Sequence, residues 1–264
     1  MSVDRWGKQL SRRRALGMGA ATAAFVVAGC STDEPASAPA PVRPTSTHAT
    51  SSTGTSTGTP LPAPGAPAVQ LARAGNGRPH VALTFHGAGD LAIARQIHDT
   101  LGAAGAKATI MAVGTWLASS PDGIKMFFDS GHDVGNHTWS HGVLADMSTS
   151  TMLGEIERCR DKLAELLGTP GSFFRQSSAQ TATQQELVEA GIAGYRRVLS
   201  YDIDGLDWKD PGPDVIRSAV ATATAGSVVS LHLGHQGTVA ALPGILSDLA
   251  ARGLTPVTAT ELLG

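Results

Sequence analysis

The sequence predicts an α/β domain, a deformed (β/α) barrel of about seven strands, over residues 78–264. Apolar runs of strand length recur along this part of the chain, and helical patterns lie between most of them. Such repeated alternation, with strands that are apolar throughout, is typical of a buried parallel sheet. In barrels of this kind the functional groups gather where the strands end, so polar residues at those positions are candidates for a site.

The expected strands span residues 80–85, 107–113, 132–136, 172–175, 196–203, 227–232 and 255–258. A helix between them is indicated by apolar residues at spacings of four and three, namely Met152, Ile156, Cys159, Leu163 and Leu166. This stripe places Cys159 on a buried helix face, where a packing role is favoured over that of a nucleophile. Another helix is expected over residues 90–103, with Asp90 as its N-cap.

The first 30 residues indicate an export signal. The arginines from Arg12 to Arg14 precede an apolar run from Ala20 to Ala28, which is too short to span a membrane. The arginines resemble a twin-arginine export signal, and the sequence Val-Ala-Gly-Cys ending at Cys30 resembles a bacterial lipobox. We therefore expect a lipoprotein whose lipidated Cys30 anchors it at the outer face of the cytoplasmic membrane, in the cell envelope. The alternative is an ordinary signal peptide that contains a cysteine by chance.

Residues 31–77 consist largely of Ser, Thr, Pro, Ala and Gly, with almost no large apolar side chain. Such a segment cannot offset its chain entropy by burial, so it is expected to be a disordered linker between the lipid anchor and the domain. The net charge is −2, and no basic patch is interleaved with aromatic residues, which argues against nucleic acid as a partner. The expected organisation is a signal peptide over 1–30, a linker over 31–77 and a folded domain over 78–264.

Polar residues follow five of the expected strands, at His86, residues 136–141, Arg175, Asp207–Trp208 and His232. If these strands are parallel neighbours, their ends lie on one rim of the barrel. His137 and His141 are four residues apart, and we expect them on one side of a helical turn, where they could share a metal ion. A metal site at this rim is therefore the leading hypothesis from the residues alone.

The segments GHDVGNHTWSH, FFR, DIDGLDW and SVVSLH…LPGIL resemble, in order and spacing, the motifs of the polysaccharide deacetylase (NodB-homology) family. The resemblance covers essentially the whole domain, and the histidine-containing motif is its most specific part. It implies a deformed (β/α) barrel and a divalent metal, usually zinc, held by one Asp and two His. It also implies removal of N- or O-acetyl groups from an acetylated polysaccharide, such as the glycan of peptidoglycan.

The resemblance implies that His137 and His141 bind the metal and that Arg175 holds a catalytic base in place. Members of the family carry Thr-Phe-Asp-Asp-Gly in the first motif, where the first Asp is the base and the second is a metal ligand. In this chain His86 and Gly87 stand at those two positions, so neither carboxylate is present. Two imidazoles alone make a poor zinc site, and the cation at Arg175 would face the metal without an anion between them.

The residues at the positions of the general acid and its carboxylate partner match the family. The resemblance implies that His232 is the general acid that protonates the leaving group and that Asp207 is the carboxylate paired with it. It places Trp208 and Leu231 in the wall of the substrate pocket. In the family a metal-bound water attacks the acetyl carbonyl while a carboxylate takes its proton.

Three readings of His86 stay open at this point. His86 is a third nitrogen ligand in a three-histidine zinc site, with Asp90 or the metal hydroxide as base. Alternatively, His86 is itself the base and the metal is held weakly. In the third reading hydrolysis is lost, a saccharide-binding cleft remains, and His86 is a buried or rim histidine. The expected function is a metal-dependent hydrolase of carbon–nitrogen or ester bonds in acetylated carbohydrate, and the alternative is a catalytically inactive glycan-binding lipoprotein.

Overall fold

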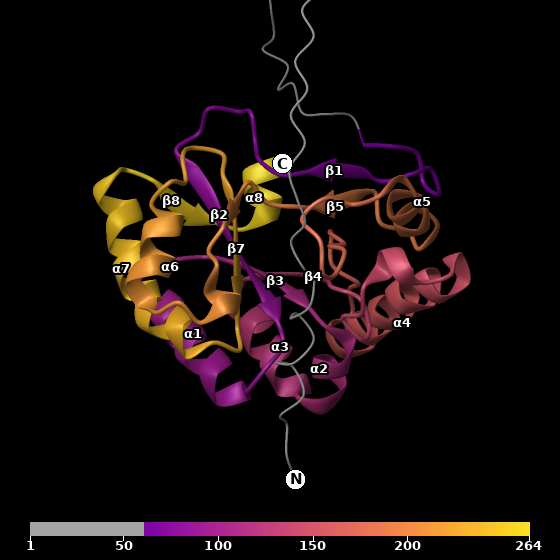
Figure 1. Ribbon diagram of the computed structural model, residues 1–264, viewed down its shortest axis with the longest axis horizontal. Helices are drawn as coiled ribbons and strands as arrows, with labels where there is room; N and C mark the ends of the chain where they lie inside the picture. The colour runs from indigo at the N-terminus through magenta and orange to yellow at the C-terminus, as the bar shows by residue number, and fades with distance from the viewer. Residues whose placement is uncertain (1–60) are drawn as a thin grey trace, which may run out of the picture. The chain divides into compact units, whose positions relative to one another are not determined.

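The structure is a computed structural model that describes residues 61–264. The expected signal peptide, the expected lipidation site at Cys30 and residues 31–60 of the expected linker lie outside the described residues. Within residues 61–264, parallel strands form the centre and helices lie around them (Figure 1). None of the helices in this range is both long and apolar enough to cross a membrane.

The main sheet has the strand order β4-β3-β2-β7-β6, with β8 also paired to β2, and every one of these pairings is parallel. Its strands are β2 (His80–Gly87), β3 (Thr109–Ala112), β4 (Asp133–Asn136), β6 (Ile203–Asp204), β7 (Val228–His232) and β8 (Thr255–Val257). A second parallel pair joins β1 (Val69–Leu71) to β5 (Arg197–Leu199). Phe174 forms bridges to both Asn136 and Val198 and so connects the two sheets. The fold is the deformed (β/α) barrel that the sequence predicts.

Three segments differ from the expected strands. Residues 172–175 contribute only the bridges at Phe174, and the expected strand over 196–203 is divided into β5 and β6. The third difference is β1, which lies in the segment expected to be a linker and is flanked by the buried residues Ala68 and Ala74. The boundary expected at residue 78 is therefore too late, because β1 pairs with β5 through the backbone and the side chain of Gln70 accepts a hydrogen bond of 2.6 Å from the Ala182 N–H.

The helices are α1 (Leu91–Ala103), α2 (Gly114–Ser119), α3 (Pro121–Asp129), α4 (Thr149–Leu167), α5 (Gln184–Ile192), α6 (Pro213–Val220), α7 (Gln236–Ala251) and α8 (Ala259–Leu263), with 3₁₀ turns η1 (Leu144–Asp146) and η2 (Asp207–Lys209). The Asp90 carboxylate accepts a hydrogen bond of 2.7 Å from the Ala92 N–H and caps α1, as the sequence predicts. In α4, Cys159 is fully buried, and burial raises the pKa of its thiol to about 12. This confirms a packing role for Cys159.

Strand β2 separates the apolar core from the candidate site. Val81, Leu83 and Phe85 are fully buried in the main core cluster, which also contains residues of α1 and α7. Side chains alternate across a strand, so Thr84 and His86 face the other side, toward the interior of the barrel. The packing of the core therefore fixes the direction in which His86 points.

Candidate metal and acid–base site

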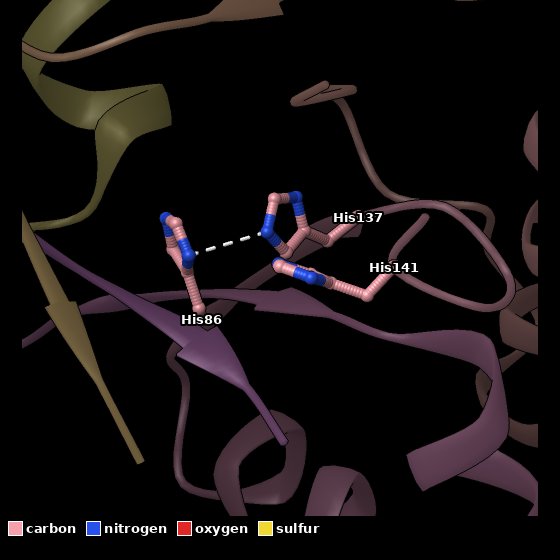
Figure 2. A group of neighbouring side chains, drawn as sticks. All are labelled: His86, His137 and His141. Carbon is pink, nitrogen blue, oxygen red and sulfur yellow. Dashed lines mark hydrogen bonds between the residues drawn. The ribbon is translucent and has the colours of Figure 1, made fainter. Parts of the chain in front are cut away.

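Three histidines converge at the carboxyl ends of β2 and β4. His86 lies on β2, His137 follows β4 directly, and His141 lies in the loop beyond it (Figure 2). One nitrogen of each ring lies within 4.8 Å of the others. Nδ1 of His86 lies 3.2 Å from Nε2 of His137. The predicted convergence of His137 and His141 is confirmed, and His86 joins them.

The loop that carries His137 and His141 is not the helical turn expected from their spacing. Thr138 and His141 have φ values of 66° and 60°, in the left-handed region that non-glycine residues rarely occupy. Local hydrogen bonds hold this backbone: the Thr138 N–H donates to Asn136 Oδ1 at 2.9 Å, and the His141 N–H donates to Thr138 Oγ1 at 3.1 Å. These bonds bring the ring centroids of His137 and His141 to 4.7 Å without a helix.

The protonation states of the three rings favour metal binding. Burial is the largest cause that lowers the pKa of His86 and of His137 well below 6.5, and neighbouring imidazoles lower both further. Burial also lowers the pKa of His141. Nδ1 of His137 lies 3.0 Å from the carbonyl oxygen of Arg175, so it carries the proton and leaves a lone pair on Nε2. At neutral pH the rings are uncharged, which is the state that ligates metals.

The three nitrogens fit a zinc ion. Zinc binds imidazole nitrogens at about 2.0–2.1 Å in tetrahedral sites, so neighbouring ligand nitrogens are then roughly 3.4 Å apart. The separation of 3.2 Å between His86 and His137 already matches this value. The other separations between ligand nitrogens are at most 4.8 Å, so the side chains would need only small movements to bind a zinc ion. Three imidazoles with a fourth position left for water form a known type of catalytic zinc site.

A histidine–aspartate pair lies beside the metal-ligand candidates. Nδ1 of His232 lies 2.8 Å from Oδ1 of the fully buried Asp207. The other oxygen of Asp207 accepts the His232 backbone N–H at 2.7 Å and the Thr238 hydroxyl at 2.6 Å. The ring of His232 is 4.3 Å from that of His86, centroid to centroid. The pairing that the resemblance implied for these two residues is therefore present, next to the three histidines.

Arg175 does not hold a catalytic base. Its guanidinium is fully buried and donates to the carbonyl oxygens of Leu199, at 2.6 Å, and Ser200, at 3.3 Å, while Nη1 has no partner. Within residues 61–264 no carboxylate forms an ion pair with it. Burial lowers the pKa of Arg175 to about 9. The role expected from the resemblance is corrected: Arg175 orients His137, through its backbone carbonyl.

The two other carboxylate positions considered from the sequence also point away from the rings. A Cβ atom on Gly87 would lie 3.0 Å from Cα of Ala112 and 3.1 Å from Cγ2 of Ile110, so this position faces packed core atoms. Asp90, the alternative base, is exposed and its carboxylate caps α1. Neither position supplies an acid to the histidines.

The two residues expected in the pocket wall, Leu231 and Trp208, differ in their exposure to solvent. Leu231 is fully buried in the main core cluster with Phe85, so the expectation that it lines the pocket is wrong. Alternation along β7 places Ser230, two residues before His232, on the side of the histidines instead. Ser230 Oγ lies 3.3 Å from Nε2 of His86, and counting back by two from His232 would have found it. Trp208 remains half exposed, so its place in the pocket wall stays a prediction.

Comparisons with known proteins point to one family. A family model described as polysaccharide deacetylase matches residues 73–195. A peptidoglycan-N-acetylglucosamine deacetylase of Bacillus cereus is 31% identical over 199 residues, which cover 71% of this chain and 90% of that protein.

Solved structures with the same fold include one described as a deacetylase and one described as a pseudoenzyme. A peptidoglycan N-acetylglucosamine deacetylase superposes with a TM-score of 0.68 and 29% identity, covering 73% of this chain and 92% of that one. A protein of Bacillus anthracis described as a CE4 family pseudoenzyme superposes with a TM-score of 0.69 and 23% identity, covering 74% of this chain and 69% of that one. The second likeness concerns the fold alone.

Proposed function

Because the chain belongs to the polysaccharide deacetylase family, we propose that it removes acetyl groups from N-acetylglucosamine in cell-envelope glycan at a three-histidine zinc site. The observation that carries this proposal is the convergence of His86, His137 and His141 beside the His232–Asp207 pair. A missing carboxylate is thus replaced by an imidazole that reaches the same cluster from β2. Relatives that act on peptidoglycan N-acetylglucosamine support the choice of substrate.

The metal ligands in this proposal are His86, His137 and His141. A zinc ion held there supplies Lewis-acid polarisation of the acetyl carbonyl. The uncharged state of the three rings at neutral pH supports this assignment, because a protonated imidazole has no lone pair to donate. The backbone carbonyl oxygen of Arg175 contributes by accepting a hydrogen bond from Nδ1–H of His137, which fixes the ring so that Nε2 faces the cluster.

His232 carries the proton transfers. Asp207 accepts its Nδ1–H, so Nε2 is the nitrogen that exchanges protons with the substrate side. Among residues 61–264 no carboxylate is hydrogen-bonded to His86 or His137 that could serve as a separate base. We therefore assign both steps to His232: Nε2 takes a proton from the attacking water and returns it to the leaving nitrogen. Thr238 holds Asp207 through a hydrogen bond of 2.6 Å.

The test is acetate release from N-acetylglucosamine oligomers and from peptidoglycan by the purified full-length chain. We expect release after incubation with zinc, loss after chelation, and loss in His232→Ala. A zinc-loaded protein that binds these glycans but releases no acetate would instead support a second candidate, a non-hydrolytic glycan-binding protein. The specific observation that favours this second candidate is the unpartnered Nη1 of Arg175, which marks a carboxylate absent from the site.

We also propose that the protein is exported and held at the outer face of the cytoplasmic membrane by a lipid on Cys30. The support is the sequence alone, because Cys30 lies outside the described residues. Acyl chains add about 0.8 kcal/mol of membrane affinity per buried methylene group. Cell fractionation tests this: the wild-type chain is expected in the membrane fraction and Cys30→Ser in the released fraction. Equal membrane retention of both chains would remove the proposal.

A further inference from the structure

Ser230 occupies a buried position behind His86. It lies on β7 next to the strand that carries His86, and its side chain is almost fully buried at 1% exposure. Within residues 61–264 its hydroxyl makes one side-chain hydrogen bond, of 3.3 Å, to Nε2 of His86. The imidazole of His86 is thus held at both nitrogens, by Ser230 on one side and by His137 on the other.

The positions of the protons in the hydrogen bonds from Arg175 through His137 and His86 to Ser230 follow from the Arg175 end of the series. The carbonyl oxygen of Arg175 only accepts, so Nδ1 of His137 carries a proton and Nε2 of the same ring accepts. Nδ1 of His86 must therefore donate to Nε2 of His137. A neutral His86 then has a lone pair on Nε2, and the Ser230 hydroxyl donates to it.

Metal binding changes the roles of both ring nitrogens of His86. The lone pair of His137 Nε2 is then used by the metal, and Nδ1 of His86 must lose its proton to become a ligand beside it. In a neutral ring the proton moves to Nε2, which becomes a donor. The partner of Nε2 must now accept. A hydroxyl both donates and accepts, so Ser230 keeps its hydrogen bond in both states without moving.

We propose that Ser230 is a positioning residue that holds His86 as the third ligand of a divalent cation, by donating to Nε2 in the free protein and accepting from Nε2–H in the loaded one. The inference rests on the proposed three-histidine site and adds a residue that the resemblance does not assign. It also identifies Nδ1 as the ligand atom of His86. Hydrogen bonds of this kind orient metal ligands, and their loss typically weakens metal affinity 10–100-fold.

The experiment is a zinc titration of the full-length chain in competition with a chromophoric chelator. We expect Ser230→Ala to bind zinc about 10–100-fold more weakly than the wild type. The matched control is Thr84→Val, because Thr84 is a fully buried neighbour on the same face whose hydroxyl donates to the Val229 carbonyl oxygen and does not contact His86. Its zinc affinity should stay within about threefold of the wild type. Equal affinity of Ser230→Ala and wild type, or an equal loss in both variants, would overturn the proposal.

A second measurement identifies which nitrogen of His86 binds the metal and which carries the proton. In ¹⁵N NMR spectra of imidazole-labelled, zinc-loaded protein, His86 should show a protonated Nε2 and a metal-bound Nδ1. Binding through Nε2 would refute the role of Ser230 while leaving the metal site intact. A wild-type chain that binds no zinc would refute the proposed metal site itself, so the two failures are distinguishable.

Discussion

Nδ1 of His86 lies 3.2 Å from Nε2 of His137, although His86 lies on β2, His137 directly follows β4, and β3 lies between these two strands in the sheet. Their ring centroids are 4.2 Å apart. This contact places His86, the residue that alters the first motif, within the histidine cluster. His86 does not stand at the rim as an isolated side chain, because it shares a hydrogen bond with the best-placed metal ligand of the cluster.

The first prediction concerns His86 as a ligand. We expect His86→Ala to weaken zinc binding by more than about 100-fold, because loss of even an outer partner of a ligand costs 10–100-fold. Competition titration with a chelator measures this. His235→Ala is the control, because His235 also neighbours His232 but bonds to Asp210 instead of to the cluster. Unchanged zinc affinity in His86→Ala would mean that His86 is not a ligand.

The second prediction concerns restoring a carboxylate. We expect His86→Asp to fold and to bind zinc with His137 and His141, since carboxylate oxygen is a normal zinc ligand and the new charge lies near the unpaired Arg175. Gly87→Asp should instead lower the free energy of unfolding by about 3 kcal/mol or more, because it forces a charged side chain against packed core atoms. Urea unfolding compares the two. Greater stability of Gly87→Asp than of His86→Asp would contradict the packing seen around Gly87.

These contacts also show what the sequence reveals and what it leaves out. The strand ends at His86 and His232 follow from local apolar patterns, and parallel strands bring their ends to one rim. Alternation along the strand already places Ser230 on the same face as His232, but the strand order that puts β2 beside β7 is a property of the whole sheet, so the contact of Ser230 with His86 follows only from the structure. The local conformation of His141 was also hidden, because a spacing of four suggests a helix while local hydrogen bonds stabilise a left-handed loop.

Strand β1 was missed for a related reason. Val69 and Leu71 are among the few large apolar residues of the Ser-, Thr-, Pro-, Ala- and Gly-rich segment 31–77, whose composition is that of a linker. The order of β1 comes from backbone hydrogen bonds to β5, a partner more than a hundred residues away along the chain. Composition reports the tendency of a segment to bury side chains, and it carries no information on pairing through the backbone alone.

The third prediction concerns the acid–base pair. We expect His232→Ala to lower the rate of acetate release about 10²–10⁴-fold while zinc affinity stays near that of the wild type. Thr238→Val removes one hydrogen bond to Asp207 and should lower the rate by a smaller factor, about fivefold, corresponding to roughly 1 kcal/mol. Paired measurements of rate and bound zinc test both. If the zinc content of His232→Ala fell in parallel with its rate, His232 would be a ligand rather than the proton carrier.

The last prediction concerns stability and pH in the metal-free protein. Burial lowers the pKa of His86, His137 and His141 below 6.5 in the folded state, and lowers that of His132 to about 4. Once unfolded, these imidazoles return to a pKa near 6.5. Below pH 6.5 the unfolded chain therefore binds more protons, so the free energy of unfolding falls as the pH decreases, and above that pH the effect disappears.

Each such imidazole contributes a slope of up to about 1.4 kcal/mol per pH unit. Urea unfolding in the presence of a chelator, between pH 7.5 and 5.5, measures the combined slope while most carboxylates remain ionised. His86→Ala removes one of these groups and should give a shallower slope than the wild type. A constant free energy of unfolding would mean that folding leaves the pKa of the rings unchanged, and a rise on acidification would mean that folding favours their protonated forms. Such charged rings could not serve as the metal ligands proposed here, because a protonated imidazole has no lone pair to share.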